Sequence, residues 1–390
     1  MTIIGIDFGN KYTKVYRIKN GKAEAVFTES SERKFLSTIT LIQNLRVFGN
    51  LAAVAKNSKT SYQNIVALLN SPHPLSPDTH TGLHVTNPKI HLLVIFLNYI
   101  KKLVDSSLIE CVFSFSCQQN SVLTDLVRSA CKIVDFSILG ILDANLASSL
   151  GYSFFKLMQQ EYLEPQRALF YNIGHCNSNF SIIEFHNNTI TQVATQLCQI
   201  GVGVIDQFLL DICTTHIQTT HGINLQTHTK SYLSLLQQCQ KTKQILSSNA
   251  ETYIRAEFFL PTQEFSINIK ITQEELNRFI TETILPDIQR SVVELLHDQD
   301  VTTISLLVPS GGGARLPIIS EAMCGYTQLA LNKIVDFDES VAKGCALYGG
   351  IHSDNIQTKV NIKIKYPVME TIKLDFIGQG NQLFKEGKLT

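Results

Sequence analysis

Three short glycine turns constrain the fold of this chain more than any other feature. They are Asp7-Phe8-Gly9-Asn10-Lys11, Asn172-Ile173-Gly174-His175-Cys176 and Ser310-Gly311-Gly312-Gly313-Ala314-Arg315, and each follows an apolar stretch typical of a buried strand. Glycine leaves the backbone N–H groups of a turn open to an anion, because no Cβ stands in the way. Each turn alone is compatible with an ordinary loop. Three of them in this order favour phosphate-binding loops around one cleft.

The order of the predicted elements repeats along the chain. Strands open it, mixed helices follow, and after residue 160 the order returns, with three strands over residues 167–197 and a turn at Asn187-Asn188. A helical region is predicted from residue 203 to about residue 249, and Thr272-x-x-Glu275 has the pattern of a capping box. These patterns predict a duplicated α/β fold with a central cleft. Two unrelated α/β domains would give a similar pattern.

Size and composition exclude several classes of function. The 390 residues suffice for two lobes with a core each, and 44% of them are hydrophobic. Lys+Arg and Asp+Glu number 33 each, so no basic field indicates nucleic acid or an anionic membrane as a partner. The longest apolar stretch, residues 90–100, is too short to span a bilayer. Nine scattered cysteines without a CxxC pair indicate reduced thiols, and the histidines lack zinc-ligand spacing.

The three turns and their surroundings resemble the 70-kilodalton heat-shock chaperone family, which shares the ATPase fold of actin and the sugar kinases. The resemblance is carried, in the family's order, by "IGIDFGNKYT", "FYNIGHCNSNFS", "QIGVGVIDQFLL", "KTKQILSSNAE", "SGGGARLP" and "FDESVAKGCALYGG". It covers residues 2–351. Other stretches, such as "DANLASSLGYSFF", look most like the large atypical branch, which includes the 170-kilodalton glucose-regulated chaperone of the endoplasmic reticulum and the 110-kilodalton co-chaperones.

The resemblance implies a two-lobed actin-like ATPase fold. A nucleotide-binding domain is expected over residues 1–355, with lobe I at about 1–160 plus 340–355 and lobe II at about 165–339. Residues 356–390 are expected to form a linker and the truncated start of a substrate-binding β domain, and their alternating pattern agrees with that.

The implied role is that of a nucleotide-exchange factor and holding co-chaperone for a conventional 70-kilodalton heat-shock chaperone. Unfolded client polypeptides would bind through a C-terminal region that is missing here. The resemblance to the 170-kilodalton chaperone implies the endoplasmic reticulum lumen. The cysteines and the absence of a signal peptide before the first strand favour the cytoplasm instead.

The site residues follow from the resemblance, motif by motif. ATP or ADP is expected between the lobes, with Mg²⁺ held through water by Asp7. The implied nucleotide-binding residues are Asp7, Gly9, Asn10, Lys11, Tyr12, Gly174, His175, Gly201, Lys243, Gln244, Ser247, Gly311, Gly312, Gly313, Arg315 and Asp338.

Several positions depart from the family's pattern and decide the expected chemistry. Asn172 and Asn177 stand where the family has an aspartate of the metal shell and a threonine near the γ-phosphate, and Ala144 stands where it has a carboxylate. Residues 66–69 hold no lysine where the catalytic lysine is expected. Losing one phosphate-directed group costs on the order of 10²–10³ in rate in comparable sites. Weak or absent hydrolysis is therefore expected.

Two alternatives remain open at this point. A working ATPase would need Asp143 and Lys11 in the missing roles, which makes Asp7 and Asp143 the candidate catalytic residues. A scaffold that has lost nucleotide is the second alternative. It is suggested by Val202 in place of a family glycine and by Gln244 in place of an arginine beside the adenine.

Overall fold

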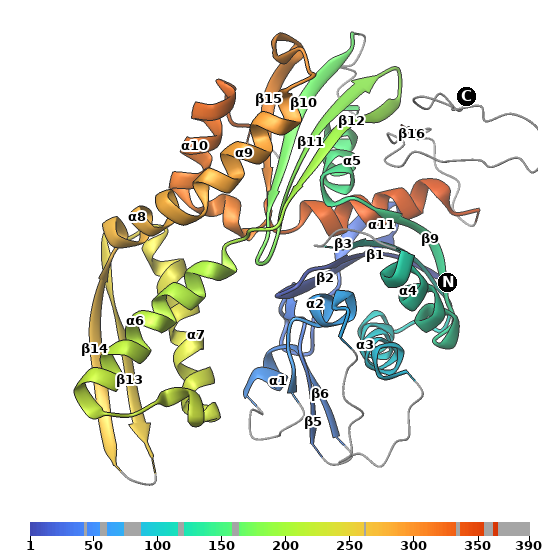
Figure 1. The fold of residues 1–390 in the computed structure, drawn as a ribbon. Helices are drawn as coiled ribbons and strands as arrows, with labels where there is room; N and C mark the ends of the chain where they lie inside the picture. The colour runs from blue at the N-terminus through green and yellow to red at the C-terminus, as the bar shows by residue number, and fades with distance from the viewer. Residues whose placement is uncertain are drawn as a thin grey trace, which may run out of the picture.

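Two sheets, each covered by helices, form two lobes (Figure 1). The structure is a computed structural model, which describes residues 1–42, 45–54, 61–73, 87–115, 121–157, 164–260, 263–332, 336–354 and 362–365. Below, lobe I is the part built on the sheet that contains the N-terminal strand, and lobe II is the part built on the other large sheet. The mixed α/β class predicted from the sequence is confirmed.

The sheet of lobe I has its strands in the order β3-β2-β1-β8-β9, with β4 also paired to β2. Strands β1, β8 and β9 are parallel, whereas β1 and β2 form an antiparallel hairpin around the first glycine turn. The strands are β1 (Thr2–Phe8), β2 (Tyr12–Lys19), β3 (Lys22–Ala25), β4 (Phe35–Leu36), β8 (Ile109–Phe115) and β9 (Phe136–Leu142).

Strand β1 is buried on both faces, and its alternating side chains meet different helices. Ile4, Ile6 and Phe8 belong to the core that also contains α3 (Pro88–Val104). Gly5 points the other way, where a Cβ would lie 2.1 Å from the backbone nitrogen of Ala346 in α11. Only glycine lets α11 lie this close to the strand. The remaining elements of lobe I are α1 (Gly49–Val54), α2 (Ile65–Asn70), α4 (Ser121–Ile133) and a small sheet of β5 (Ile39–Ile42), β6 (Leu45–Phe48) and β7 (Ser61–Tyr62).

The sheet of lobe II has the order β15-β10-β11-β12-β16. Its first three strands in the sequence form the predicted meander, and Asn187 and Asn188 make the turn with φ of 46° and 58°, a conformation that asparagine tolerates. Strand β16 pairs in parallel with β12 at the sheet edge. The rest of 356–390 lies outside the described residues, so the β domain stays a prediction. The strands are β10 (Gln166–Ile173), β11 (Ser178–His186), β12 (Thr189–Cys198), β15 (Ile304–Ser310) and β16 (Lys363–Lys365).

The helical region predicted over residues 203–249 is two helices rather than one. Helix α6 ends where Gly222 adopts φ 68°, and a short 3₁₀ turn separates it from α7. The predicted capping box is confirmed, because Thr272 and Glu275 exchange hydrogen bonds at the start of α8. The bounds in lobe II are α6 (Gly203–His221), η1 (Leu225–Thr227), α7 (Thr229–Leu246), β13 (Glu251–Phe259), β14 (Glu264–Thr272), α8 (Gln273–Thr283), α9 (Leu285–Leu296), η2 (Val301–Thr303), η3 (Gly312–Arg315) and α10 (Pro317–Thr327).

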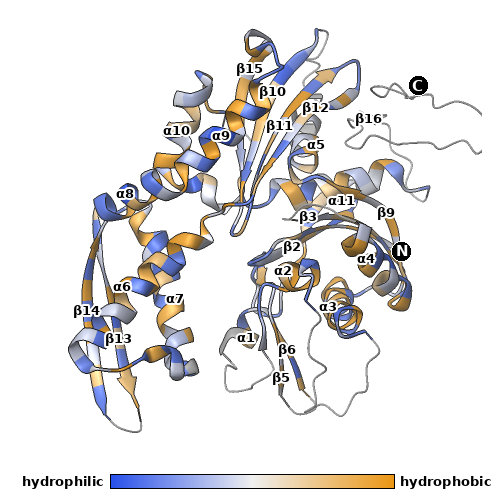
Figure 2. Cartoon of the chain, in the orientation of Figure 1, coloured by the Kyte–Doolittle hydropathy of each residue, from blue (hydrophilic) through white to orange (hydrophobic). Residues whose placement is uncertain are grey.

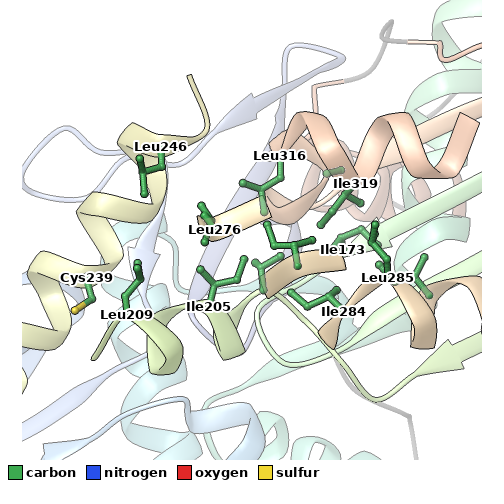
Figure 3. Close-up of a cluster of buried hydrophobic side chains, with 14 of the residues drawn as sticks. Ile173, Ile205, Leu209, Cys239, Leu246, Leu276, Ile284, Leu285, Leu316 and Ile319 are labelled. Carbon is green, nitrogen blue, oxygen red and sulfur yellow. The ribbon is translucent and has the colours of Figure 1, made fainter. Parts of the chain in front are cut away.

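Each lobe has a cluster of buried apolar side chains. Helices such as α6 and α8 carry both hydrophobic and hydrophilic residues along their length (Figure 2). The core of lobe II contains the end of β10, the start of α6 and the start of α10, which meet through Ile173, Ile205 and Ile319 (Figure 3). Burial of one such side chain stabilises the fold by roughly 1.5–3 kcal/mol. This core therefore holds the elements that carry the glycine turns of lobe II.

The lobes are joined by two helices that lie in close contact, α5 (Ala144–Leu157) and α11 (Ser340–His352). Helix α5 also packs on β10 and β11 of lobe II, while α11 packs on β1 and β2 of lobe I. At their contact, a Cβ on Gly344 would lie 1.7 Å from the carbonyl oxygen of Ala147. The two backbones approach this closely because that Cβ is absent.

We expect Gly344→Ala to destabilise the protein by at least about 3 kcal/mol, since the new methyl group would force α5 and α11 apart. The matched control is Gly325→Ala on the exposed surface of α10, where a Cβ meets no atom within 4 Å. That substitution should stabilise by about 0.5–1 kcal/mol, because alanine is the better helix former. Urea unfolding measures both, and equal effects would contradict the close helix contact.

Candidate functional site

The first glycine turn joins β1 to β2. The Gly9 N–H donates to the Tyr12 carbonyl at 3.1 Å, and Ser37 Oγ donates to the Gly9 carbonyl at 2.6 Å. A Cβ on Gly9 would lie 2.4 Å from the Tyr12 oxygen, so the turn requires glycine here. Asn10 and Lys11 occupy its tip and line the space between the lobes.

The second glycine turn follows β10 and is supported from behind. The Gly174 N–H donates to the Asn177 carbonyl at 2.9 Å, and the Gly203 N–H donates to the His175 carbonyl at 2.7 Å. Gly201 lies against the outside of this turn, where a Cβ would come within 2.6 Å of the His175 carbonyl. Gly201 therefore shapes the turn without lining the cleft.

The third glycine turn follows β15 and leads into η3. Gly311 has φ 81°, and its N–H donates to the Phe337 carbonyl at 2.7 Å. A Cβ on Gly312 would meet only a carboxylate oxygen of Asp338, at 3.8 Å. The turn is therefore open towards the cleft at Gly312 and anchored to the start of the α11 segment at Gly311.

The three turns border one cleft of about 520 Å³ between the lobes, within the range of small-molecule sites. Every residue predicted to bind nucleotide lines it except Gly201. That these residues bind nucleotide remains a prediction. Sequence reasoning did not select Lys14, Lys34, Leu316, Phe337 and Val341, which line the cleft as well, beside the noted departures Ala144, Asn172 and Val202.

A buried charge cluster connects the lobes at the inner end of the cleft. Asp206 of α6 lies 2.5 Å from Lys243 Nζ on α7 and 3.4 Å from Lys11 Nζ of lobe I. Its side chain is only 3% exposed. Burial lowers the pKa of Lys11 to about 8, although Asp206 opposes that shift. Burial, with Lys11 and Lys243 nearby, also lowers the pKa of His175 to about 4, so its ring is neutral at pH 7.

This cluster changes the expected role of Lys243. The resemblance implied that Lys243 and Ser247 bind nucleotide. The Lys243 ammonium instead points to Asp206 and donates to the Val202 carbonyl at 3.0 Å. Ser247 follows the last residue of α7, and its hydroxyl donates to the Gln244 carbonyl at 2.7 Å. Both residues still line the cleft.

The outer part of the cleft holds a second charge cluster, centred on Asp338. Its carboxylate lies 3.0 Å from Lys34 Nζ and 3.2 Å from an Arg315 nitrogen. Burial alone would raise the pKa of Asp338, but Lys14, Lys34 and Arg315 together hold it below its ordinary value. The Arg315 guanidinium also lies 5.9 Å from the ring centre of Phe337, close enough for a cation–π contact.

Asp7, the residue expected to hold Mg²⁺ through water, is paired with a lysine. It lies directly opposite Lys14 in the β1–β2 hairpin, and Lys14 Nζ donates to its carboxylate at 2.8 Å. Asn172 does not add a carboxylate, and its amide donates to Ser310 Oγ at 2.9 Å. Ala144 adds no ligand either. The residues present therefore do not fit a carboxylate shell for Mg²⁺, and no group of three or more metal-binding side chains converges within the described residues.

Asp143, the other candidate catalytic residue, caps a helix. Its carboxylate accepts hydrogen bonds from the backbone N–H groups of Asn145 and Leu146 at the start of α5, and from the Asn179 and Gln192 amides. Burial raises the pKa of Asp143 despite these bonds. It does not line the cleft, although its neighbour Ala144 does. This geometry argues against a role for Asp143 as a base towards nucleotide.

The model of the family described as Hsp70 protein matches residues 91–371 of the chain. The chain belongs to the Hsp70 family. Its lobes and cleft accordingly have the actin-like ATPase fold that the sequence resemblance implied. The chain spans about half the length of the curated relatives it matches.

Three relatives show how far the similarity extends. "Heat shock 70 kDa protein 16" of Arabidopsis thaliana is 22% identical, over 89% of this chain and 49% of the relative. "Heat shock 70 kDa protein 4" of Homo sapiens is 23% identical, over 94% of this chain and 48% of the relative. The "97 kDa heat shock protein" of Strongylocentrotus purpuratus is 22% identical, over 92% of this chain and 44% of the relative. Matches to these heat-shock proteins are consistent with an atypical branch of the Hsp70 family.

The neutral ring of His175 makes the stability of this Hsp70-family domain depend on pH. Its pKa of about 4 in the folded state lies below the ordinary 6.5, so below pH 6.5 only the unfolded chain gains a proton there. Stability is lost as the pH falls from 6.5 towards 4, by about 2 kcal/mol at pH 5 for a shift of this size. The unfolding free energy of His175→Asn should fall less between pH 7.5 and pH 5 than that of the parent. The matched control is His216→Asn, because His216 is exposed, and its unfolding free energy should change with pH as that of the parent does. If the unfolding free energy of His175→Asn also changes with pH as in the parent, the buried neutral ring is refuted.

Proposed function

We propose that this domain binds ATP or ADP between its lobes and serves an atypical Hsp70-type chaperone as the nucleotide-responsive part. The whole protein would act as a nucleotide-exchange factor and holding co-chaperone for a conventional 70-kilodalton partner, with weak or no hydrolysis. Clients would bind through the part of the protein beyond this chain, since the relatives are about twice its length.

The observation that carries this proposal is the cleft itself. Both lobes contribute glycine turns to it, and both contribute cations: Lys11, Lys14 and Lys34 from lobe I, Lys243 and Arg315 from lobe II. Backbone N–H groups and ammonium groups suit the phosphates of a nucleotide. A ligand that touches both lobes favours their closed arrangement, provided it binds that arrangement more tightly.

The residues in and around the cleft also argue against hydrolysis. Phosphoryl transfer to water needs an oriented nucleophile, a metal and cations near the developing charge. Ala144 offers no carboxylate, Asp143 is used as a helix cap, and α2 turns Val66 and Leu69 into the core instead of a lysine into the cleft. The working-ATPase alternative would therefore have to rely on Asp7, which Lys14 already neutralises.

The nucleotide-free scaffold is the second candidate. Val202 lines the cleft where a family glycine is expected, and Gln244 offers no guanidinium to an adenine. Against it stands the open cleft, where five cationic side chains are paired with only three carboxylates, an excess of positive charge that an anionic ligand would offset.

The partners and the compartment are proposed from the resemblance. The proposed compartment is the endoplasmic reticulum lumen, with the cytoplasm as the alternative, which the free thiols of the described cysteines favour. The balanced charge gives no reason to propose nucleic acid as a partner. Among the helices in the described part of the chain, none is long and apolar enough to cross a membrane.

Gly312→Val tests nucleotide binding directly. At Gly312 an added Cβ would meet no atom closer than 3.8 Å, so we expect the fold to stay intact while ATP and ADP affinity falls by at least about tenfold. Calorimetric titration measures the affinity, and thermal unfolding checks the fold. Gly325→Ala, outside the cleft, is the matched control and should bind like the parent.

Two further measurements distinguish the proposed function from the working ATPase and the nucleotide-free scaffold. A long phosphate-release assay should show at most slow turnover, and rapid steady turnover abolished by Asp7→Ala would favour the ATPase instead. The domain should also speed ADP release from a conventional 70-kilodalton chaperone. No heat on titration with either nucleotide would leave only the scaffold.

A further inference from the structure

Lys14 pairs with Asp7, the residue that the family resemblance implies would hold Mg²⁺ through water. The two side chains are each only 12% exposed, and the pair lies in the wall of the cleft. The Lys14 ammonium lies 2.8 Å from the Asp7 carboxylate, so the two groups form a close ion pair. The ammonium has three N–H donors, and the bond to Asp7 uses one of them.

The other carboxylates around the cleft are paired in the same way. Asp206 lies between Lys243 and Lys11, and Asp338 lies between Lys34 and Arg315. In this part of the described chain, cationic side chains therefore outnumber carboxylates. The cleft carries positive charge of its own, where a metal-dependent site would carry a surplus of carboxylates.

Recruiting Mg²⁺ to Asp7 would disturb this arrangement. The metal would have to displace the Lys14 ammonium, and that ammonium would then sit buried beside a divalent cation. Asn172 and Ala144, which face the same space, provide no second carboxylate to offset the repulsion. The local charge balance thus favours the lysine over the ion.

We propose that Lys14 takes the place of the divalent cation, so that nucleotide phosphates bind in this cleft without Mg²⁺. The inference rests on the proposed nucleotide binding and adds its cation requirement. The ammonium keeps one bond to Asp7 and directs its remaining N–H groups to phosphate oxygens. The affinity for nucleotide then does not depend on Mg²⁺.

The test is a calorimetric titration of the domain with ATP in two buffers, one with excess Mg²⁺ and one with EDTA. The expected dissociation constants agree within about threefold, a small difference in binding free energy. Binding only with Mg²⁺ would overturn the inference and leave the proposed function standing. An absence of binding in both buffers would instead remove the proposed function on which the inference rests.

Lys14→Met provides the decisive variant. Without the ammonium, affinity in EDTA should fall by about tenfold or more, the contribution of a charge-assisted hydrogen bond. Asp7 is then free to receive Mg²⁺, so the ratio of the two dissociation constants should rise well above one. The matched control is Lys34→Met, which removes a cleft cation paired with Asp338 and should leave that ratio near one.

A double variant keeps the test valid if Lys14→Met unfolds because Asp7 is left buried without its partner. Lys14→Met combined with Asp7→Asn removes both charges, and its affinity should be low in both buffers. Unchanged affinity in EDTA for either variant would overturn the role of Lys14. A ratio that stays near one in a folded Lys14→Met would do the same.

Discussion

Ionised carboxylates held away from water must be paired with cations, and this constraint organises the space between the two lobes. Moving a lone carboxylate out of water is costly, so a buried one either takes up a proton or finds a cation. Asp7, Asp206 and Asp338 each find one or more. Because their partners come from different turns and helices, the pairs fix where the glycine turns stand relative to one another.

Close backbone contacts between α5, α11 and β1 also restrict how the two lobes can be arranged. Gly5 and Gly344 let three backbones approach within contact distance, which leaves little room for sliding at the centre of the molecule. Across the cleft, the lobes are also joined by the Lys11–Asp206 bridge. In the proposed function, a ligand between the lobes acts on ion pairs such as this one and so shifts the balance between open and closed arrangements.

Much of this arrangement could be read from the sequence, and the remainder depended on contacts between distant segments. Strand periodicity and glycine turns predicted the α/β fold, and the family resemblance brought the cleft residues together. The pairing of Lys14 with Asp7 was also accessible in principle, since strands pair symmetrically about a hairpin turn and these residues stand opposite each other. Asp143 directly before a helical run is likewise a typical cap. The bridge from Asp206 to Lys243 was not accessible, because α6 and α7 meet only through tertiary packing.

The departures from the family's pattern change the charge balance of the cleft in one direction. Each lost carboxylate, at Asn172 and Ala144, lowers the demand for a metal, and Lys11 and Lys14 supply positive charge from the chain itself. Under the proposed function, such a site would stabilise bound phosphates in the ground state without special stabilisation of a transition state, so that nucleotide binds with weak or no hydrolysis. A ligand bound this way can hold a conformation for as long as it stays bound. That behaviour suits a protein that responds to nucleotide and acts on a partner, since the shift in lobe populations depends only on the difference in affinity between the two arrangements.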